Sequence, residues 1–232
     1  MIFPVTFLSL GPGNAECLTI QAVKTLKEAA VMFLPATRSA EGYLTSRVVD
    51  IAGEWCDKNC IQLFEVPMQT DRKAAIESYD GLCADVISYV SRGQKVVVGV
   101  EGDVSIYASV HYVMNRLKDA GIAVQQLAGI PSFIAAAARA GISLVSQHQQ
   151  LIIMPGDATV ETLESMMDDR HTIVIMKLSR CQDALRTFLM RHPAVECHYF
   201  ENVGCPDGFY TTDINALFHR TFPYFSLCII RL

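Results

Sequence analysis

The feature that most constrains the fold of this chain is an alternation, through its first half, of short β-branched runs with segments of helical spacing. After Thr19 and again after Asp71, apolar residues recur every three or four positions, which is typical of amphipathic helices. Strands that alternate with helices predict a mainly parallel sheet with helices on its faces. The strand-like runs lie at residues 5–10, 31–34, 61–66, 96–100 and 124–127.

The pattern changes after residues 129–131, where glycine and proline cluster. An alanine-rich helix at 135–140 comes first, and further helices are expected from Thr159 and Ser179. The last two strand-like runs have no long helix between them, which favours a mixed sheet. We therefore predict an α/β fold of two domains, residues 1–127 with a mainly parallel sheet and 128–232 with a mixed sheet. The runs in the second half lie at residues 151–154, 173–176, 197–200 and 225–230.

Composition favours a chain that folds throughout, since 51% of its residues are hydrophobic and 19% are charged. The uncharged run 120–138 is nearly long enough to span a bilayer. Gly121, Gly129 and Pro131 interrupt it, so we predict a strand, a turn and a helix start there, and no membrane association. The N-terminus lacks the basic segment of a signal peptide, which predicts a cytoplasmic protein. A net charge of −5 argues against a nucleic-acid partner.

Neither cysteine nor histidine forms a convincing metal motif. Most of the eight cysteines lie inside apolar periodic segments, as expected of buried thiols in a reducing compartment. Cys56 and Cys60 have a spacing that hints at a metal, but no second pair follows. The six histidines form no close pair, so we predict no protein-bound metal.

The first candidate site is the loop Gly11-Pro12-Gly13-Asn14, which directly follows the first predicted strand. Two glycines and a proline allow a tight turn and a close approach to a ligand. The spacing matches neither the dinucleotide-binding nor the ATP-binding glycine motif. An ordinary turn between a strand and a helix explains this stretch equally well.

Two further loops follow strand-like runs. Residues 101–107 bring an acid, a hydroxyl and an aromatic ring to a strand end, where open α/β sheets bind ligands. Such a loop could hold an amino acid and a ribose, although Asp103 or Ser105 could instead cap the next helix. Residues 128–139 place Pro131 near the start of an alanine-rich helix. Those alanines allow close packing against a flat partner, or simply mark a tightly packed core helix.

Taken together and in this order, the three loops resemble those of the tetrapyrrole methylases. The shared pattern is G-P-G-N with E-C-L-T after it, then G-D-V-S-I-Y, then G-I-P-S-F with alanines and G-I-S-L. Residues 101–107, 175–177 and 223–227 further resemble the branch that methylates carbon 20 of precorrin-2 or its cobalt complex in cobalamin biosynthesis. The resemblance implies two α/β domains with a cleft between them, S-adenosylmethionine as methyl donor, S-adenosylhomocysteine as product, a tetrapyrrole substrate and a homodimer.

The same resemblance implies roles for particular residues, although none is identified with certainty as catalytic. The residues expected to bind the cofactor are Glu101, Gly102, Asp103, Tyr107, Ser132, Phe133, Met176, Asn202, Val203, Tyr224, Phe225 and Ser226. The glycine-proline loop is expected to face the macrocycle. Because the macrocycle carries carboxylate arms, basic residues should bind it as well. The residues expected on the substrate side are Gly11, Pro12, Gly13, Asn14, Arg38, Arg47, Lys177 and Arg180.

Two positions depart from the family pattern. Most relatives carry Asp where this chain has Asn14, and an amide can orient a ligand but cannot take up a proton. A lysine is expected where this chain has Arg38, which keeps the charge and adds a bidentate donor. Two other functions stay open: a methylase that acts on another corrin position, on uroporphyrinogen III, on protein or on ribosomal RNA, and a non-catalytic tetrapyrrole-binding protein.

Overall fold

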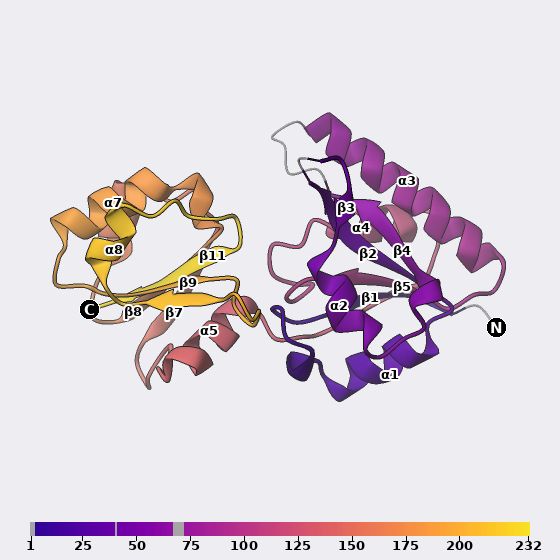
Figure 1. The fold of residues 1–232 in the computed structure, drawn as a ribbon, viewed down its shortest axis with the longest axis horizontal. Coiled ribbons are helices and arrows are strands. Elements are labelled where there is room, and N and C mark those ends of the chain that lie inside the picture. The colour runs from indigo at the N-terminus through magenta and orange to yellow at the C-terminus, as the bar shows by residue number, and fades with distance from the viewer. Residues whose placement is uncertain (1–2, 40, 67–71) are drawn as a thin grey trace. The chain divides into compact units, whose positions relative to one another are not determined.

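The computed structural model describes residues 3–39, 41–66 and 72–232. Asp71, which precedes the second predicted helix, lies outside these residues. Contacts within the chain divide it into two compact units, Met1–Pro131 and Ser132–Leu232 (Figure 1). The proposed domains 1–127 and 128–232 stay a prediction.

The sheet of the first unit is mainly parallel, as predicted. Its order is β3-β2-β5-β1-β6, and β4 pairs with β2. Every pairing is parallel except that of β2 with the short β3. The strands are β1 (Val5–Ser9), β2 (Val31–Arg38), β3 (Leu44–Thr45), β4 (Ile61–Glu65), β5 (Val96–Val100) and β6 (Val124–Leu127).

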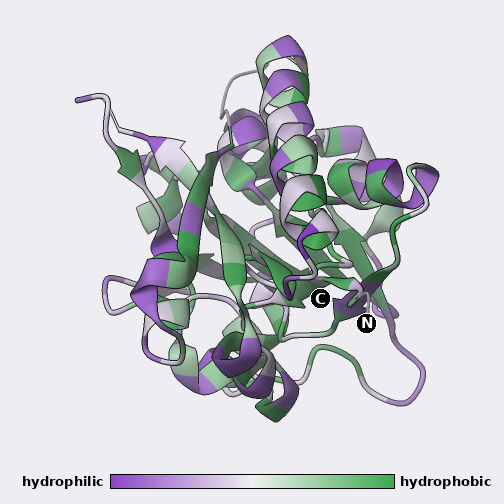
Figure 2. Ribbon diagram, turned by 90° about the vertical axis from the view of Figure 1, so that its right-hand side faces the viewer, coloured by the Kyte–Doolittle hydropathy of each residue, from purple (hydrophilic) through white to green (hydrophobic). Residues whose placement is uncertain are grey.

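Helices cover both faces of this sheet, because successive strand residues point to opposite faces. In β2, Val31 and Phe33 join one core cluster with α3 and α4, whereas Met32 and Leu34 join another with α1 and α2. Figure 2 shows the result as apolar strands beneath helices of mixed hydropathy. The helices are α1 (Ile20–Glu28), α2 (Arg47–Gly53), α3 (Arg72–Ser91) and α4 (His111–Asp119), with short 3-10 turns η1 (Ala15–Cys17) and η2 (Lys58–Cys60).

The second unit has the mixed sheet that the sequence predicts, in the order β10-β9-β11-β8-β7. Only the pairing of β7 with β8 is parallel. Helices α6, α7 and α8 pack on one face of the sheet, and α5 lies on the other (Figure 1). The elements are α5 (Ser132–Ala140), β7 (Gln150–Met154), α6 (Val160–Met166), β8 (His171–Met176), η3 (Leu178–Arg180), α7 (Gln182–Arg191), β9 (Glu196–Glu201), β10 (Phe209–Thr211), α8 (Ile214–Phe218) and β11 (Ser226–Arg231).

Two kinds of local difference from the sequence prediction have physical reasons. The helix expected from Ser179 starts later, since a 3-10 turn occupies 178–180 and α7 begins at Gln182. Strands β3 and β10 and helices α2 and α8 were not predicted, because two to seven residues are too short to display a period. Across the described residues, no helix has both the length and the apolar character needed to cross a bilayer.

Candidate functional site: strand-end loops in each unit

In the first unit, the loops after β5 and β6 are joined by the carboxylate of Asp103, a residue only 7% exposed. One oxygen accepts the Ser105 N–H at 2.8 Å, and the other accepts the Gly129 N–H at 2.6 Å. The Ser105 hydroxyl donates to the same carboxylate. Burial raises the pKa of Asp103, but hydrogen bonds from Ser105, Gly129 and Ser9 outweigh it and hold this pKa below its usual range. Asp103 thus links two loops as an ion.

Neither Asp103 nor Ser105 caps the helix that follows, so that alternative from the sequence is wrong. Helix α4 begins at His111 and has Val110 at its N-cap position. The side chain of His111 instead returns to the loop, with Nε2 at 2.9 Å from the carbonyl oxygen of Val104. This contact requires the hydrogen on Nε2, since a carbonyl can only accept.

Ser9, the last residue of β1, links a third strand end to the same loops. Its hydroxyl donates to the Leu127 carbonyl at 2.7 Å and accepts the Val104 N–H at 2.9 Å. A Cβ at Gly129 would lie 2.4 Å from the Cβ of Ser9, so only glycine allows this close approach. Ser9 was not among the site residues predicted from the sequence. The available signal was a hydroxyl between two leucines at the end of a buried strand.

The glycine-proline loop is held to the loop after β5 by a pair of backbone hydrogen bonds. The N–H of Gly102 donates to the Gly11 carbonyl at 2.7 Å, and the N–H of Gly11 donates to the Gly102 carbonyl at 3.1 Å. Gly11 and Pro12 are buried, whereas Gly13 and Asn14 are half-buried. The side-chain oxygen of Asn14 accepts the Glu16 N–H at 2.9 Å and so caps η1.

Glu101 lies two positions before Asp103 but has a different environment. Its Oε1 is 3.4 Å from Nε of Arg47, the first residue of α2, and the two side chains are 21% and 30% exposed. Burial raises the pKa of Glu101 above its usual range, and the nearby Arg47 counters only part of that rise. The structure therefore joins a predicted cofactor residue to a predicted substrate residue through an ion pair.

Arg38 is the other arginine that the sequence assigns to the substrate side in this unit. Its Nε donates to Glu65 at 3.1 Å, and its Nη2 donates to the second oxygen of that carboxylate. Its Nη1 donates to the Gly42 carbonyl at 2.8 Å. Half of the Arg38 side chain is exposed, so a ligand carboxylate could reach it only by sharing the guanidinium with Glu65.

In the second unit, the ends of β8 and β9 meet the start of β11. Met176 pairs with Leu227 across β8 and β11. Beyond the strands, the Lys177 N–H donates to the Ser226 carbonyl at 2.9 Å, and the Asn202 N–H donates to the Phe225 carbonyl at 2.9 Å. Nζ of Lys177 lies 5.7 Å from the ring centroid of Tyr224. Predicted residues from three separate segments are thus brought to one edge of this sheet.

Three residues of the candidate site have left-handed backbones. Among the described residues, the non-glycine positions with positive φ are Tyr107 at 50°, Lys177 at 60° and Asn202 at 47°. Such conformations cost free energy for side chains other than glycine, and they concentrate at functional sites. All three belong to the set that the sequence assigned to cofactor or substrate.

The remaining predicted residues differ in burial. Phe133 and Val203 are 4% and 6% exposed, so their side chains belong to the core. Ser132 is the first residue of α5. Arg180 lines a surface hollow of about 300 Å³ together with Asp157 and Gln182.

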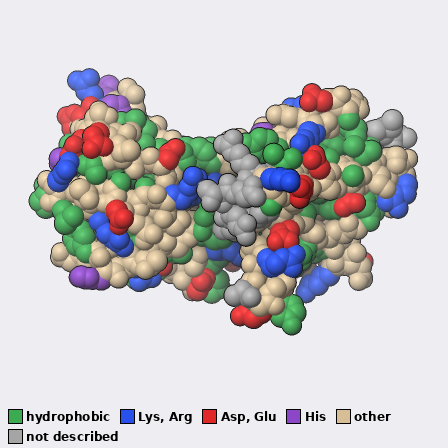
Figure 3. Space-filling view, turned by 90° about the horizontal axis from the view of Figure 1, so that it is seen from above, with side chains coloured by type: hydrophobic (Ala, Val, Ile, Leu, Met, Phe, Trp, Pro, Cys, Tyr) green, Lys and Arg blue, Asp and Glu red, His purple; other side chains and the backbone are tan. Residues whose placement is uncertain are grey.

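The charged groups on one face of the molecule and the metal-binding groups of the described residues are dispersed. On the face drawn in Figure 3, basic and acidic side chains lie next to one another and do not form a continuous basic stripe. The eight cysteines are free thiols. In the part of the chain that the structure describes, no group of three or more His, Cys, Asp or Glu side chains could hold a metal ion.

Comparison with known proteins gives a family match over most of the chain. The family model described as Tetrapyrrole (Corrin/Porphyrin) Methylases matches residues 4–216. A protein of Methanocaldococcus jannaschii named probable cobalt-precorrin-2 C(20)-methyltransferase is 27% identical over 178 residues, 77% of this chain and 74% of that protein. The cobalt-precorrin-2 C(20)-methyltransferase of Salmonella typhimurium is 23% identical over 228 residues, 96% of this chain and 94% of that protein.

Solved structures share the fold at low sequence identity. A cobalt precorrin-4 methyltransferase superposes with a TM-score of 0.75 at 15% identity, covering 97% of this chain and 94% of that one. A uroporphyrin-III C-methyltransferase of Thermus thermophilus, in complex with S-adenosylhomocysteine, gives a TM-score of 0.68 at 18% identity. That comparison covers 99% of this chain and 97% of the other. These likenesses confirm the two-sheet α/β fold that the sequence predicts.

Proposed function

Because this chain belongs to the tetrapyrrole (corrin/porphyrin) methylase family, we propose that it transfers a methyl group from S-adenosylmethionine to carbon 20 of precorrin-2 or cobalt-precorrin-2. The observation that carries this proposal is the similarity, along nearly the whole chain, to a relative named for that reaction. The reaction belongs to cobalamin biosynthesis, and the second product is S-adenosylhomocysteine.

Each unit has exposed groups at its strand ends of the kind that binds an adenosyl amino acid. Tyr107 in the first unit is 42% exposed, and Tyr224 and Phe225 in the second unit are 36% and 37% exposed, so each ring offers apolar surface to a base. Adding a Cβ to Gly102 would meet no atom within 4 Å, so the space beside its Cα is open, although its N–H and carbonyl are paired with Gly11. Glu101 supplies a partly buried carboxylate, which suits the positive charge of a sulfonium. When bound, the cofactor would supply an electrophilic methyl group.

The protein's own contribution to this reaction is mainly alignment. The leaving thioether is neutral, so the transfer needs little acid-base chemistry, and placing nucleophile, methyl and sulfur in line gives much of the rate. The electron-rich meso carbon of a reduced tetrapyrrole would take the methyl group as the methyl–sulfur bond breaks, and the macrocycle would then lose the meso proton to solvent. We assign to Glu101 the stabilisation of positive charge near the reacting atoms, since its carboxylate is shielded from bulk water. Asn14, as an amide, would orient the macrocycle without accepting a proton.

The proposal is tested by offering the purified protein both macrocycles under anaerobic conditions with methyl-labelled S-adenosylmethionine. We expect label at carbon 20, located by NMR, and kcat/KM measured for each macrocycle identifies the preferred metal state. Label at another carbon would place the protein in a sister branch of the family. No transfer to either macrocycle, with tight tetrapyrrole binding, would show a carrier and overturn the proposal.

An Arg38→Ala variant should raise KM for the tetrapyrrole about tenfold, because a charge-assisted contact to a carboxylate arm is lost. KM for S-adenosylmethionine should not change. The matched control is Glu65→Gln, which keeps the Arg38 guanidinium but removes its competing carboxylate. In that control KM for the tetrapyrrole should stay or fall. An unchanged KM in Arg38→Ala would remove Arg38 from the substrate side.

The remaining parts of the proposal concern assembly and location. We propose a cytoplasmic homodimer in which residues 1–127 bind the macrocycle and residues 128–232 supply much of the cofactor site. Family likeness supports the dimer. Sedimentation equilibrium of the purified protein measures the oligomeric state.

A further inference from the structure

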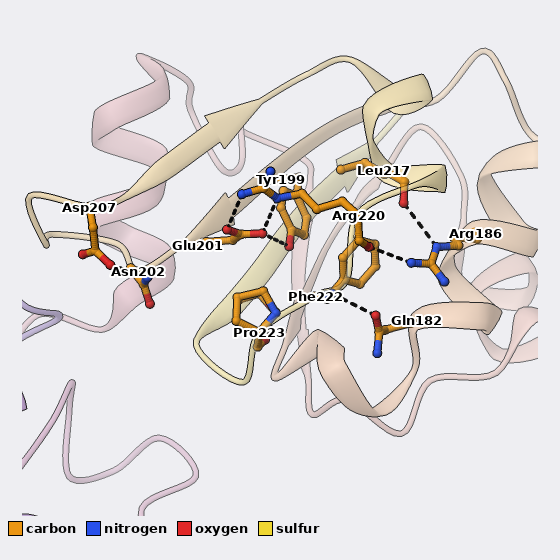
Figure 4. Close-up of polar contacts among 11 residues, drawn as sticks. Gln182, Arg186, Tyr199, Glu201, Asn202, Asp207, Leu217, Arg220, Phe222 and Pro223 are labelled. Atoms are coloured by element: carbon orange, nitrogen blue, oxygen red, sulfur yellow. Dashed lines mark hydrogen bonds and ion pairs between the residues drawn. The ribbon is translucent and has the colours of Figure 1, made fainter. Parts of the chain in front are cut away.

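A buried polar network lies at the end of β9, directly before the left-handed Asn202 (Figure 4). Glu201 is 7% exposed and accepts three hydrogen bonds. The Tyr199 hydroxyl donates at 2.5 Å, and Arg220 donates twice, from Nε at 2.5 Å and from Nη2 at 2.7 Å. The Arg220 guanidinium also lies 3.8 Å from the ring centroid of Phe209 on the adjacent strand β10.

Arg220 belongs to the connection between α8 and β11. Side chains of α7 also form hydrogen bonds with this connection. The Arg220 carbonyl accepts Nη2 of Arg186 at 2.7 Å, and the Phe222 N–H donates to Gln182 at 2.8 Å. The buried Phe222 ring packs against Tyr199 with centroids 4.9 Å apart. This connection is therefore fixed by its side chains and its backbone before it reaches Pro223 (Figure 4).

The network stands next to two groups proposed to enclose the cofactor. Asn202 follows Glu201 directly, and its N–H donates to the Phe225 carbonyl at 2.9 Å. Tyr224 and Phe225 lie at the end of the connection between α8 and β11, directly after Pro223. A shift of either Glu201 or Arg220 would thus move both the Asn202 turn and the aromatic pair.

The electrostatics favour a network that stays charged. Burial raises the pKa of Glu201, but the hydrogen bonds from Arg220 and Tyr199 outweigh it and hold this pKa below its usual range. Burial, together with Glu201, raises the pKa of the Tyr199 hydroxyl, which keeps it a donor. A buried carboxylate with three donors costs desolvation free energy, and such pairs often add little net stability over an apolar replacement.

We propose that Glu201 and Arg220 are positioning residues for S-adenosylmethionine, and that their ion pair sets the geometry of the Asn202 turn and of Tyr224 and Phe225. This inference rests on the proposed function of the same site. It assigns neither residue a direct contact with the cofactor.

The same sheet supplies a matched control at its opposite end. Glu196, the first residue of β9, accepts Nε and Nη2 of Arg231 at 2.5 and 2.9 Å. Arg231 is the last residue of β11. This pair has the same Glu–Arg chemistry on the same strand β9, with a more exposed carboxylate, and it lies at the strand ends away from Asn202 and Tyr224.

The test compares Glu201→Gln with Glu196→Gln in steady-state methyl transfer. For Glu201→Gln we expect KM for S-adenosylmethionine to rise about tenfold, with kcat and the tetrapyrrole KM within about threefold of wild type, as for loss of uniform binding. Glu196→Gln should keep all three parameters. An unchanged cofactor KM in Glu201→Gln, or an equal rise in both variants, would overturn the proposal.

A double variant separates positioning from stability. Glu201→Gln with Arg220→Met removes both charges, so the penalty of an unpaired buried group should be relieved and the thermal midpoint should recover. The cofactor KM should stay raised. If that KM recovers together with the midpoint, the network is only a folding element and the proposal is wrong.

Calorimetric titration of S-adenosylhomocysteine distinguishes this failure from failure of the proposed function. If the wild-type protein binds S-adenosylhomocysteine but methylates no tetrapyrrole, the proposed reaction is wrong. The positioning proposal is then tested by the affinity of Glu201→Gln for S-adenosylhomocysteine. We expect that affinity to be about tenfold weaker than that of wild type. Equal affinities would overturn the positioning role.

Discussion

An Asp103→Asn variant should lose about 100-fold in kcat/KM, because a misplacement of about 1 Å at a reacting centre has this effect. It should also lose about 3 kcal/mol of folding stability. The carboxylate accepts backbone N–H groups of Ser105 and Gly129 on its two oxygens. An amide has one acceptor oxygen, so its NH₂ group must face one of these donors. Labelled methyl transfer and urea unfolding measure the two effects.

The stability loss in Asp103→Asn should depend on pH. Since hydrogen bonds hold the pKa of Asp103 below its usual range, the carboxylate stabilises the fold above the unfolded value of about 3.9. That contribution disappears as pH falls through the folded pKa. The difference in unfolding free energy between wild type and variant should therefore be constant near neutral pH and shrink in acid.

The control for this series is Asp85→Asn, at an exposed position of α3 in the same unit. It removes the same charge and should alter neither kcat/KM nor the unfolding free energy. If kcat/KM and the unfolding free energy change as little in Asp103→Asn as in Asp85→Asn, the strand ends of β1, β5 and β6 hold together without the carboxylate.

Gly156→Ala should be the most destabilising single-methyl change in the second unit. A Cβ at this position would lie 2.0 Å from the carbonyl oxygen of Lys177 and 2.9 Å from its carbonyl carbon. Backbone atoms must move to relieve this overlap, so we expect a loss of about 3 kcal/mol. Because Lys177 bonds to Ser226, KM for S-adenosylmethionine should rise as well. Urea unfolding and initial rates give both values.

Gly81→Ala is the matched substitution, and we expect it to change the free energy of unfolding in the opposite direction. Gly81 is exposed inside α3, and an added Cβ there would meet no atom within 4 Å. Alanine in a helix interior is favoured over glycine, so this variant should gain about 0.5–1 kcal/mol. If both variants shift the urea midpoint in the same direction, the overlap at Gly156 is not what controls its effect.

The sequence predicted most of the fold because its elements are long enough to display a period. Strands β5 and β6 were predicted with the bounds that the structure has, and α1 starts after Thr19, which caps it at 3.0 Å. Short elements escaped prediction, as α8 and β10 show. Their existence depends on contacts with distant strands, which leave no local pattern.

The candidate site was predicted where a loop carries a distinctive composition, and missed where a role depends on long-range contacts. Residues 101–103 stood out as glycine and acids at a strand end, yet nothing local shows that Gly129 reaches Asp103. Ser9 and Arg220 act on partners 95 and 19 positions away. Such partners follow from strand order, and the sequence alone did not provide that order.

The left-handed backbones of Tyr107 and Lys177 have a consequence for directed evolution. Each conformation costs about 1 kcal/mol or more in a residue with a side chain, and glycine removes that cost. A library sorted only for heat resistance should therefore enrich glycine at both positions, while the same library sorted for turnover should reject it. At these two positions thermal stability favours glycine, whereas catalysis favours the native residue. Selection for activity therefore limits the melting temperature of the protein.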